Sequence, residues 1–369
     1  MILVQELIFI KLKVTTKMNK DNPHKFKVLI LTHDLKPDSG WGRYSLSIVE
    51  ELKKKKIEFK VLTTADGLSL GRVRQAARDC QIVHAFDGWP YAFWGYWAVL
   101  GTKKKLFING VGTYTISPLG HLLKGFILRL AYARAERIFC ISEYVAKRLK
   151  ELVPKAKVDV VHLGTTILKP APAPIILEVK DRFRLKDHFP ILLTVGEVKS
   201  RKGQLEVLKS LPSLVKNYPT LKYLVVGRSQ DLSYREEMIN YARAHNLENN
   251  WQLITDIKDD QFLAALYELC DVFVLAALND GRHFEGFGLV LLEANAFGKV
   301  VVGNKWCGIE DAIKDGYNGY LSIPNNTNSL TESILKAISN KEQIASQAKH
   351  WSEGFSWEKT VENYIKYYA

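Results

Sequence analysis

The chain has 369 residues, of which 47% are hydrophobic and 25% charged, and its formal net charge is +13. This length is too great for one ordinary core and fits two domains, and the composition excludes a disordered chain. The four cysteines lie far apart without a CxxC pair, which indicates neither a zinc site nor a disulfide framework, so we expect buried free thiols in a reducing compartment.

The N-terminus begins with an apolar stretch, MILVQELIFIKLKV, that polar and charged residues interrupt. It lacks the basic start and the small-residue cleavage site of a signal peptide. No apolar run in the chain reaches the roughly 18 residues of a transmembrane helix. We expect an extension or a surface helix here, with the folded domain beginning near Lys25.

From residue 27 onward, short apolar runs alternate with helical patterns, such as the helix expected from Gly42. Runs of this kind are typical of buried parallel strands with helices between them. Five runs fall in the first half, at residues 27–33, 82–86, 105–110, 137–142 and 157–163. Five more follow, at residues 190–197, 221–227, 251–255, 271–277 and 299–304. The predicted fold class is therefore α/β, with two consecutive Rossmann-like domains.

The Pro-rich segment KPAPAP, residues 169–174, separates the two sets of strands. Its prolines stiffen it and exclude a helix or a central strand, so it is the best candidate for the linker. An ordinary surface loop would look the same.

The first motif, HDLKPDSGWGRY at residues 33–44, follows the first strand. Ligands of open α/β sheets bind beyond the C-terminal ends of strands, where this motif lies. Gly40 and Gly42 allow close backbone approach, and the next helix presents free N–H groups, which suits a phosphate. The spacing is not GxGxxG, so no dinucleotide cofactor is indicated. A plain tight turn would give a similar sequence.

Basic and apolar residues gather later in the first half. Residues 101–150 hold ten Lys or Arg against two acidic residues, and segment 86–99 adds aromatic residues near a strand end. In segment 121–139, five apolar residues at helical spacing are flanked by four basic ones. The apolar residues are Leu122, Leu123, Phe126, Ile127 and Leu130, and the basic ones are Lys124, Arg129, Arg134 and Arg137.

We interpret segment 121–139 as a surface that docks on an anionic membrane. The alternative is an ordinary core helix with solvated basic residues. Nucleic acid is not an expected partner, because no helix-turn-helix, zinc-finger or RNP pattern accompanies the charge.

In the second half, the motif VGEVKSRKGQLEVL at residues 195–208 places Arg201 and Lys202 before a helix. A cation held in a strand–helix loop can neutralise a diphosphate, whereas a solvent-facing basic turn is the alternative. Further on, Asp259 or Asp260 is expected to cap a helix from Gln261 rather than to bind a metal.

The last motif, FEGFGLVLLEANAFG, starts in a loop and continues as a buried helix. Glu285 lies in the loop and Glu293 inside the helix, where a carboxylate is unfavourable unless it is paired or accepts hydrogen bonds. Eight residues advance a helix by two turns and roughly 80°, so the two acids do not form an acid/base pair on one face. Alternatively, Glu293 pairs with a Lys or Arg, and Glu285 only interacts with the helix dipole.

These motifs together resemble those of the GT-B glycosyltransferases, more narrowly the retaining family 4, or glycosyl transferases group 1. The resemblance rests on the E-x7-E pattern from Glu285 to Glu293 and on the segment 298–321 that follows it. Supporting matches are SGWGRY, RKG, CISEYVAKRL (140–149), VVHLGTT (160–166), LAALYELCDVFVLAA (263–277) and FSWEKTVENYIKYY (355–368).

The resemblance implies a GT-B fold, in which two Rossmann-like domains with parallel sheets face each other across a cleft. A C-terminal helix is expected to cross back to the first domain. The acceptor-side domain would comprise residues 1–168 and 352–369, and the nucleotide-sugar-binding domain residues 169–351.

The resemblance also implies roles for single residues. By position, Glu285 is similar to the family's contact to the donor sugar, Glu293 to its ribose contact and Lys202 to its diphosphate cation. Arg201 is expected to supply the charge of an Arg that the family usually has at the position of Glu197. The remaining expected donor-binding residues are Gly40, Gly42, Thr255, Ile257, Gly286, Phe287, Gly288 and Leu289.

The implied function is a retaining glycosyltransferase that moves a sugar from a UDP- or GDP-sugar to a hydroxyl group. The acceptor would be a glycan or lipid-linked intermediate of cell-envelope polysaccharide, held against the first domain. We expect no metal and no cofactor, because Lys202, Arg201 and helix N-termini can stabilise the leaving diphosphate. The expected location is the cytoplasm or the inner face of the membrane.

Two alternatives remain. One is a nucleotide-sugar epimerase, which shares the architecture. The other is a non-catalytic nucleotide-sugar-binding subunit, because Val111 replaces a His that the family usually has and Glu197 replaces an Arg.

Overall fold

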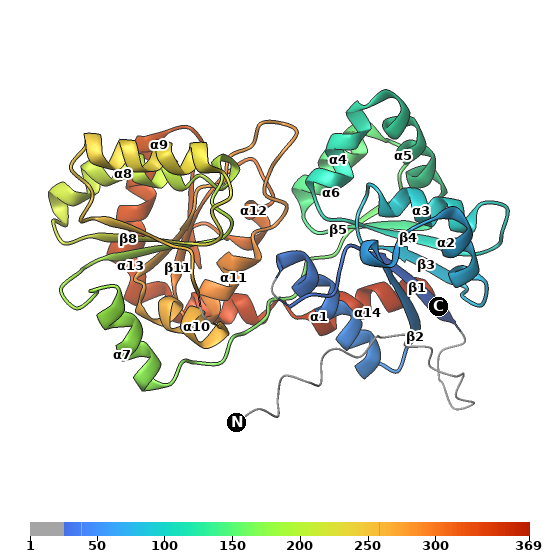
Figure 1. Ribbon diagram of the computed structural model, residues 1–369, viewed down its shortest axis with the longest axis horizontal. Coiled ribbons are helices and arrows are strands. Elements are labelled where there is room, and N and C mark those ends of the chain that lie inside the picture. Colours follow the sequence, from blue (N-terminus) through green and yellow to red (C-terminus); the bar gives the residue numbers. More distant parts are fainter. Residues whose placement is uncertain (1–25, 38, 258) are drawn as a thin grey trace.

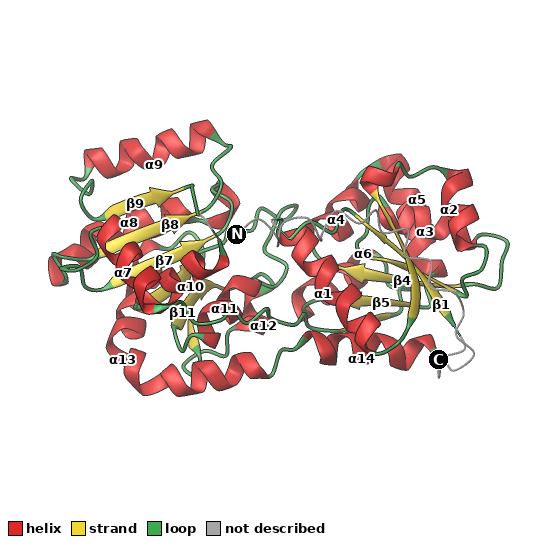
Figure 2. Ribbon diagram, turned by 60° about the horizontal axis from the view of Figure 1, so that its bottom comes forward, coloured by secondary structure: helices red, strands yellow, loops and turns green. Residues whose placement is uncertain are grey.

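The computed structural model describes residues 26–37, 39–257 and 259–369. The expectations for the N-terminal stretch and for the start of the fold near Lys25 lie outside these residues. The chain forms two lobes, and in each lobe helices cover both faces of a parallel sheet (Figures 1 and 2). Within the described ranges, no helix is both long and apolar enough to cross a membrane.

The first lobe contains a six-stranded parallel sheet in the order β2-β1-β3-β4-β5-β6. Its strands are β1 (Lys27–Thr32), β2 (Glu58–Thr63), β3 (Ile82–Ala85), β4 (Lys105–Gly110), β5 (Arg137–Cys140) and β6 (Val158–Val160). Its helices are α1 (Gly40–Lys54), α2 (Leu70–Ala77), α3 (Tyr91–Val99), α4 (Thr113–Ile116), α5 (Leu122–Arg134) and α6 (Glu143–Leu152).

The second lobe contains another six-stranded parallel sheet, in the order β12-β11-β10-β7-β8-β9. Its strands are β7 (Ile191–Val195), β8 (Lys222–Val226), β9 (Trp251–Ile254), β10 (Val272–Leu275), β11 (Val300–Asn304) and β12 (Gly319–Ser322). Its helices are α7 (Ala173–Arg182), α8 (Gln204–Asn217), α9 (Leu232–Ala244), α10 (Asp260–Leu269), α11 (Leu289–Ala296), α12 (Ile309–Ala312) and α13 (Thr327–Glu353).

Every apolar run predicted as a strand contains one, which confirms the α/β class, but β2 and β12 were not predicted. Both lie at the edge of a sheet. An edge strand needs no continuous apolar run, and β2 accordingly carries Glu58 and Lys60. β12 is short and begins at Gly319, where a Cβ atom would lie 2.2 Å from the Val301 carbonyl oxygen. All four cysteines are buried free thiols, as expected.

The Pro-rich segment 169–174 is not free of helix, contrary to expectation. Helix α7 begins at Ala173 with Pro174 in its first turn, where a proline is tolerated because no intrahelical N–H bond is lost. The N–H group of Ala171 donates to Glu268 on α10 at 2.7 Å, so the segment is fastened to the second lobe before the helix starts.

The C-terminal helix α14 (Trp357–Tyr368) crosses back to the first lobe and lies along α1 (Figure 1), as the resemblance implied. The two segments that pass between the lobes pair with each other, because the Thr165 N–H group donates to the Phe355 carbonyl at 3.1 Å. Gly164 makes this close approach possible, since its Cα faces the backbone of Trp357.

A buried polar chain ties α14 to the first sheet. His84 on β3 lies with Nε2 2.8 Å from the side-chain oxygen of Asn109, which can only accept, so Nε2 carries the hydrogen. Nδ1, 2.5 Å from the Tyr368 hydroxyl group, therefore accepts a hydrogen bond from it. Burial lowers the pKa of His84 to about 3, so the ring remains neutral.

The order of the strands determines where a ligand can bind. All strands are parallel, but the direction in which successive strands are added to each sheet changes once. This change falls between the neighbours β1 and β3 in the first lobe and between β7 and β10 in the second. Loops that follow such neighbouring strands diverge and leave a crevice at the carboxyl edge of the sheet. The motifs at residues 33–44, 195–208 and 284–298 follow β1, β7 and β10, so three of the four loops at these two crevices carry them.

We predict that Gly164→Ala destabilises the protein. A Cβ atom at residue 164 would lie 2.1 Å from the Trp357 nitrogen, which forces α14 away from the first lobe. The free energy of unfolding in urea should fall by about 1–3 kcal/mol. Gly71→Ala is the matched control, because open space surrounds Gly71 at the start of α2. Equal stability of the two variants would contradict this account of the crossing.

Candidate active site

A cleft of about 750 Å³ lies between the two lobes, at the carboxyl edges of both sheets. Its lining includes eight of the residues predicted from the sequence: Gly40, Arg201, Lys202, Ile257, Glu285, Gly286, Leu289 and Glu293. Gly42, Thr255, Phe287 and Gly288 do not line it. The predicted residues therefore converge on one site, although four of them occupy positions outside the cleft wall.

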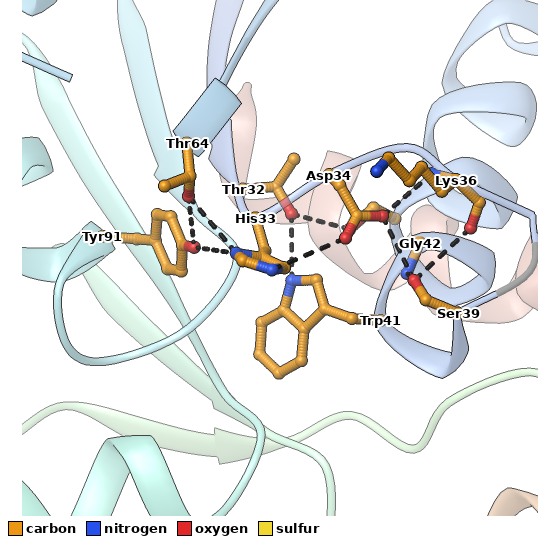
Figure 3. A network of polar contacts seen from close by, with 10 residues as sticks. Thr32, His33, Asp34, Lys36, Ser39, Trp41, Gly42, Thr64 and Tyr91 are labelled. Carbon is orange, nitrogen blue, oxygen red and sulfur yellow. Dashed lines mark hydrogen bonds and ion pairs between the residues drawn. The ribbon is translucent and has the colours of Figure 1, made fainter. Parts of the chain in front are cut away.

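The loop after β1 forms a compact turn in front of α1 (Figure 3). Asp34 accepts hydrogen bonds from the Lys36 N–H group at 2.8 Å and from the Ser39 hydroxyl group at 3.2 Å. The Ser39 oxygen in turn caps α1 by accepting from the Gly42 N–H group at 2.8 Å. Asp34 and Ser39 thus fix the start of the helix that faces the cleft.

The two glycines of this loop have different tasks. A Cβ atom on Gly42 would lie 1.9 Å from the Lys36 carbonyl oxygen, so this glycine is required by the turn itself and not by a ligand. Gly40 lines the cleft, and nothing lies within 4 Å of the place where its Cβ atom would be. Of the pair, only Gly40 offers its backbone to a bound molecule.

Two cations from the loop after β7 form ion pairs with a carboxylate from the loop after β10. Lys202 Nζ lies 2.6 Å and Arg201 Nη1 2.8 Å from the same oxygen, Glu285 Oε2. The Glu285 and Lys202 side chains are each 14% exposed, which excludes the alternative of a solvent-facing basic turn. Burial by itself would raise the pKa of Glu285, but Lys202 and Arg201 outweigh it and lower the pKa to about 2.

The backbone between β7 and α8 brings these cations into place. Gly203 has a φ of +71°, and a Cβ atom on it would lie 1.8 Å from the Ala276 carbonyl oxygen at the end of β10. This close approach is available only to glycine. The loops after β7 and β10 are therefore held together both by backbone contact and by the ion pairs of Glu285.

Glu293 lines the cleft from inside α11. Its Oε2 atom accepts a hydrogen bond from the Tyr267 hydroxyl group at 2.8 Å, and burial raises its pKa. Among the residues that the structure describes, Glu293 has no ion-pair partner, so the alternative that it pairs with a Lys or Arg is wrong there. Its other acceptor positions face the cleft and suit a ligand with two neighbouring hydroxyl groups.

The N-terminus of α11 is packed against the first lobe. A Cβ atom on Gly286 would lie 2.2 Å from the carbonyl oxygen of Val111, the residue at the position of the family's usual His. Phe287 is buried and its ring stacks on His162 at 5.5 Å. The next residue, Gly288, has a φ of +84° and is the N-cap of the helix. Gly286 and Leu289 remain in the cleft wall, whereas the Phe287 side chain belongs to the junction between the lobes.

The segment after β9 departs from expectation in two details. Ile257 lines the cleft, but Thr255 is exposed and lies outside its wall. Helix α10 begins at Asp260, one residue before Gln261, and Asp259 is the capping residue because it accepts from the Phe262 N–H group at 2.9 Å. Asp260 instead pairs with Arg43 of the first lobe at 2.5 Å.

Several residues of the cleft were missed by sequence reasoning. Glu197, known only as a departure from the family, lines the cleft and pairs with Lys199. Tyr267 holds Glu293 from a neighbouring helix, and nothing in the sequence links the two residues. Asp87 also lines the cleft, and its position in the loop after β3 is the one signal that could have revealed it.

Helix α5 exposes four of the five apolar residues that segment 121–139 was expected to present, whereas Ile127 is half-buried. Leu122 is 97% exposed, and Leu123, Phe126 and Leu130 are exposed as well. The core side of the helix is carried instead by Leu128, Ala131 and Tyr132. The alternative of an ordinary core stripe is therefore wrong for these four residues. Lys124 lies 5.5 Å above the ring of Trp89, which joins this surface to the aromatic segment 86–99.

Comparisons with known proteins agree on one class of enzyme. Residues 176–353 match the family described as glycosyl transferases group 1. An uncharacterized glycosyltransferase of Methanocaldococcus jannaschii is 25% identical over 347 residues, which cover 92% of this chain and 88% of that protein. The serotype-specific mannosyltransferase WbdA of Escherichia coli is 26% identical over 62% of this chain, but the match spans only 28% of WbdA.

The fold is also similar to that of solved structures. Anabaena HepE, crystallised in complex with UDP and glucose, superimposes with a TM-score of 0.75 at 19% identity. The superposition covers 92% of this chain and 98% of HepE, so it includes both lobes and the cleft between them.

We predict that the ion pairs of Glu285 make the stability of the protein depend on pH. The pKa of Glu285 is lowered from 4.5 to about 2, so its contribution is complete above pH 4.5 and disappears as the pH falls towards 2. The difference in unfolding free energy between the wild type and Glu285→Gln should shrink over that range. Glu236→Gln, on the exposed face of α9, is the control. A difference that does not change with pH would contradict the assignment.

Proposed function

We propose that this glycosyltransferase of group 1, which has the GT-B fold, transfers a sugar with retention of configuration from a nucleoside-diphosphate sugar to a hydroxyl group. The acceptor is a glycan or a lipid-linked intermediate of cell-envelope polysaccharide. The observation that carries the donor assignment is the arrangement of Glu285 and Glu293 in one cleft. Glu285 lies beside two cations, and Glu293 lies on α11 with acceptor positions open.

This arrangement matches the parts of a nucleotide sugar. A diphosphate needs cations, which Lys202 and Arg201 provide. A ribose presents two neighbouring hydroxyl groups, for which Glu293 has free acceptor positions. When the diphosphate binds, it competes with Glu285 for the two cations. Glu285 is then free to accept hydrogen bonds from the donor sugar.

The reaction that these groups support needs no protein nucleophile. The bond between the anomeric carbon and the diphosphate oxygen breaks as the acceptor oxygen bonds to that carbon from the same face. The acceptor proton passes to the leaving diphosphate. Lys202 and Arg201 stabilise the negative charge on this leaving group, which is electrostatic catalysis by preorganised charges.

A non-catalytic nucleotide-sugar-binding subunit is the second candidate, because Glu197 places a carboxylate in the cleft where the family usually has an Arg. A panel of UDP-glucose, UDP-N-acetylglucosamine and GDP-mannose separates the possibilities, with octyl glucoside and octyl mannoside as acceptors. UDP or GDP release supports transfer, an altered sugar supports epimerisation, and binding alone supports the subunit. The UDP bound to HepE is the reason to begin with UDP-sugars.

We predict that Lys202→Ala and Glu285→Ala each reduce turnover by roughly two to three orders of magnitude, the usual effect of removing one transition-state-stabilising group. Release of nucleoside diphosphate from the donor that the panel identifies is the measurement. Lys209→Ala, on α8 and outside the cleft, should keep the wild-type rate. Near-normal rates for both cleft variants would overturn the site assignment.

We also propose that the protein docks on the inner face of an anionic membrane through α5 and takes its acceptor from there. The exposed residues Leu122, Leu123 and Phe126 lie beside Lys124 and Arg129 on this helix. Apolar side chains next to basic ones suit the boundary between acyl chains and anionic headgroups.

We expect the wild type to float with phosphatidylcholine vesicles that contain phosphatidylglycerol, at low salt. The variant Leu123→Asp/Phe126→Asp should stay at the bottom of the gradient, because two charges then replace the inserted side chains. Leu232→Asp, at a leucine of the second lobe that is 65% exposed, is the matched control and should still float. A wild type that does not bind these vesicles would remove the docking proposal.

A further inference from the structure

Asp87 is a buried acid of the cleft that the donor site does not use. It lies two residues after the end of β3, at the point where the strand order of the first sheet changes direction, and it lines the cleft from the first lobe. Its side chain is almost completely buried, at 1% exposure. It thus faces the donor-binding loops from the opposite wall.

Three donors hold the Asp87 carboxyl group in one orientation. Its Oδ1 atom accepts from the Gly88 N–H group at 2.6 Å and from the Thr115 hydroxyl group at 2.7 Å. The Val111 N–H group is the third donor. A carboxylate has roughly four acceptor positions, so one position remains for a ligand.

The same contacts place Asp87 near the sugar end of the donor site. Thr115 Oγ1 also accepts a hydrogen bond from the Gly112 N–H group at 3.4 Å. Gly112 in turn faces Gly286, whose Cα would lie 3.5 Å from a Cβ atom built on Gly112. Gly286 is the neighbour of Glu285. The loop 111–115 therefore connects Asp87 to the part of the cleft where Glu285 lies.

No cation neutralises Asp87 within the described part of the chain. Burial raises its pKa to about 7, although Thr115, Gly88 and Val111 oppose this rise by hydrogen bonding. A buried carboxyl group without a cation is unfavourable for stability, and such groups in a cleft are frequently functional.

We propose that Asp87 binds the acceptor, by accepting a hydrogen bond from a hydroxyl group of the acceptor sugar at its remaining position. The proposal rests on the proposed function, and it adds the acceptor site to the donor site. The hydroxyl proton still passes to the leaving diphosphate, so Asp87 orients the acceptor and does not change its own protonation. Trp89, two residues further on, lies beneath Lys124 of α5, so an acceptor that arrives from this surface meets Asp87.

The test compares the wild type with Asp87→Asn, which keeps the shape and removes the charge. The donor is the one that the panel identifies, and the rates are measured with octyl mannoside or octyl glucoside and with water alone. We expect kcat/KM for the acceptor to fall by roughly 10- to 100-fold, the value of a hydrogen bond to a charged group. Donor hydrolysis should stay within about threefold. Asp187→Asn, at an exposed position, is the control and should match the wild type.

The pH profile of the wild type tests the proposal without a variant. The tyrosines that face Asp87, Tyr44, Tyr91 and Tyr132, and the thiol of Cys140 all have pKa values raised by burial, so they stay neutral near pH 7. Asp87 is ionised above its pKa of about 7 and protonated below it. Acceptor kcat/KM should therefore fall as the pH drops below about 7, and donor hydrolysis should not follow it.

Three results would overturn the assignment of Asp87. One is a flat acceptor profile in the wild type, and another is wild-type acceptor kinetics in Asp87→Asn. The third is a parallel loss of UDP binding and thermal stability in that variant, which would show a structural role. A wild type that neither hydrolyses nor transfers any donor of the panel would overturn the proposed function, and the assignment with it.

Discussion

One carboxylate oxygen, Glu285 Oε2, organises the site because it accepts hydrogen bonds from both Lys202 and Arg201. The two cations come from the loop after β7 and the carboxylate from the loop after β10, which are neighbouring strands at the reversal point of the second sheet. Without Glu285, two positive charges would lie together in a largely buried place. Without the cations, a buried carboxylate would be unpaired. The ion pairs therefore hold both cations in the cleft, where a diphosphate can replace Glu285 as their partner.

The same loop also sets the width of the cleft. Gly286 lies against the Val111 carbonyl group, so the two lobes approach at the residue next to Glu285. Asp311 of α12 reinforces the junction, because its Oδ2 atom accepts from the Glu143 N–H group at 2.9 Å and lies 2.7 Å from His162 Nε2. The proposed donor site and the first lobe are thereby brought close to one another. Val111 contributes its backbone carbonyl group to this contact between the lobes, and any residue could supply that group.

The two lobes contribute different groups to the cleft. The second lobe contributes the cations and the acids that match a nucleotide sugar, whereas the first lobe contributes Asp87 and the apolar surface of α5. Lys124 above Trp89 links that surface to the loop that carries Asp87. The path from membrane to acceptor site proposed here runs along one side of the first lobe. In this proposal, transfer takes place where the path reaches Glu285.

Local sequence determined the buried strands, the capped helix starts and the residue types at strand ends, because periodicity and capping act within a few residues. It therefore predicted the α/β class, and it identified Arg201, Lys202, Glu285 and Glu293 as the residues of interest. The edge strand β2 escaped prediction because a strand exposed on one side needs no apolar run.

Only the tertiary structure decided which residues meet. Glu285 binds Arg201 across 84 residues of sequence, and Tyr267 donates to Glu293 from another helix. Such pairings depend on the order of the strands in the sheet, which local patterns do not encode. Likewise, the sequence showed that Gly42 is a glycine in a strand-end loop, but only the packing showed that it serves the turn. Only the packing showed, too, that Asp87 lines the cleft. Burial and long-range contact, which set the charge state of each acid, arise only when each lobe folds around its own sheet.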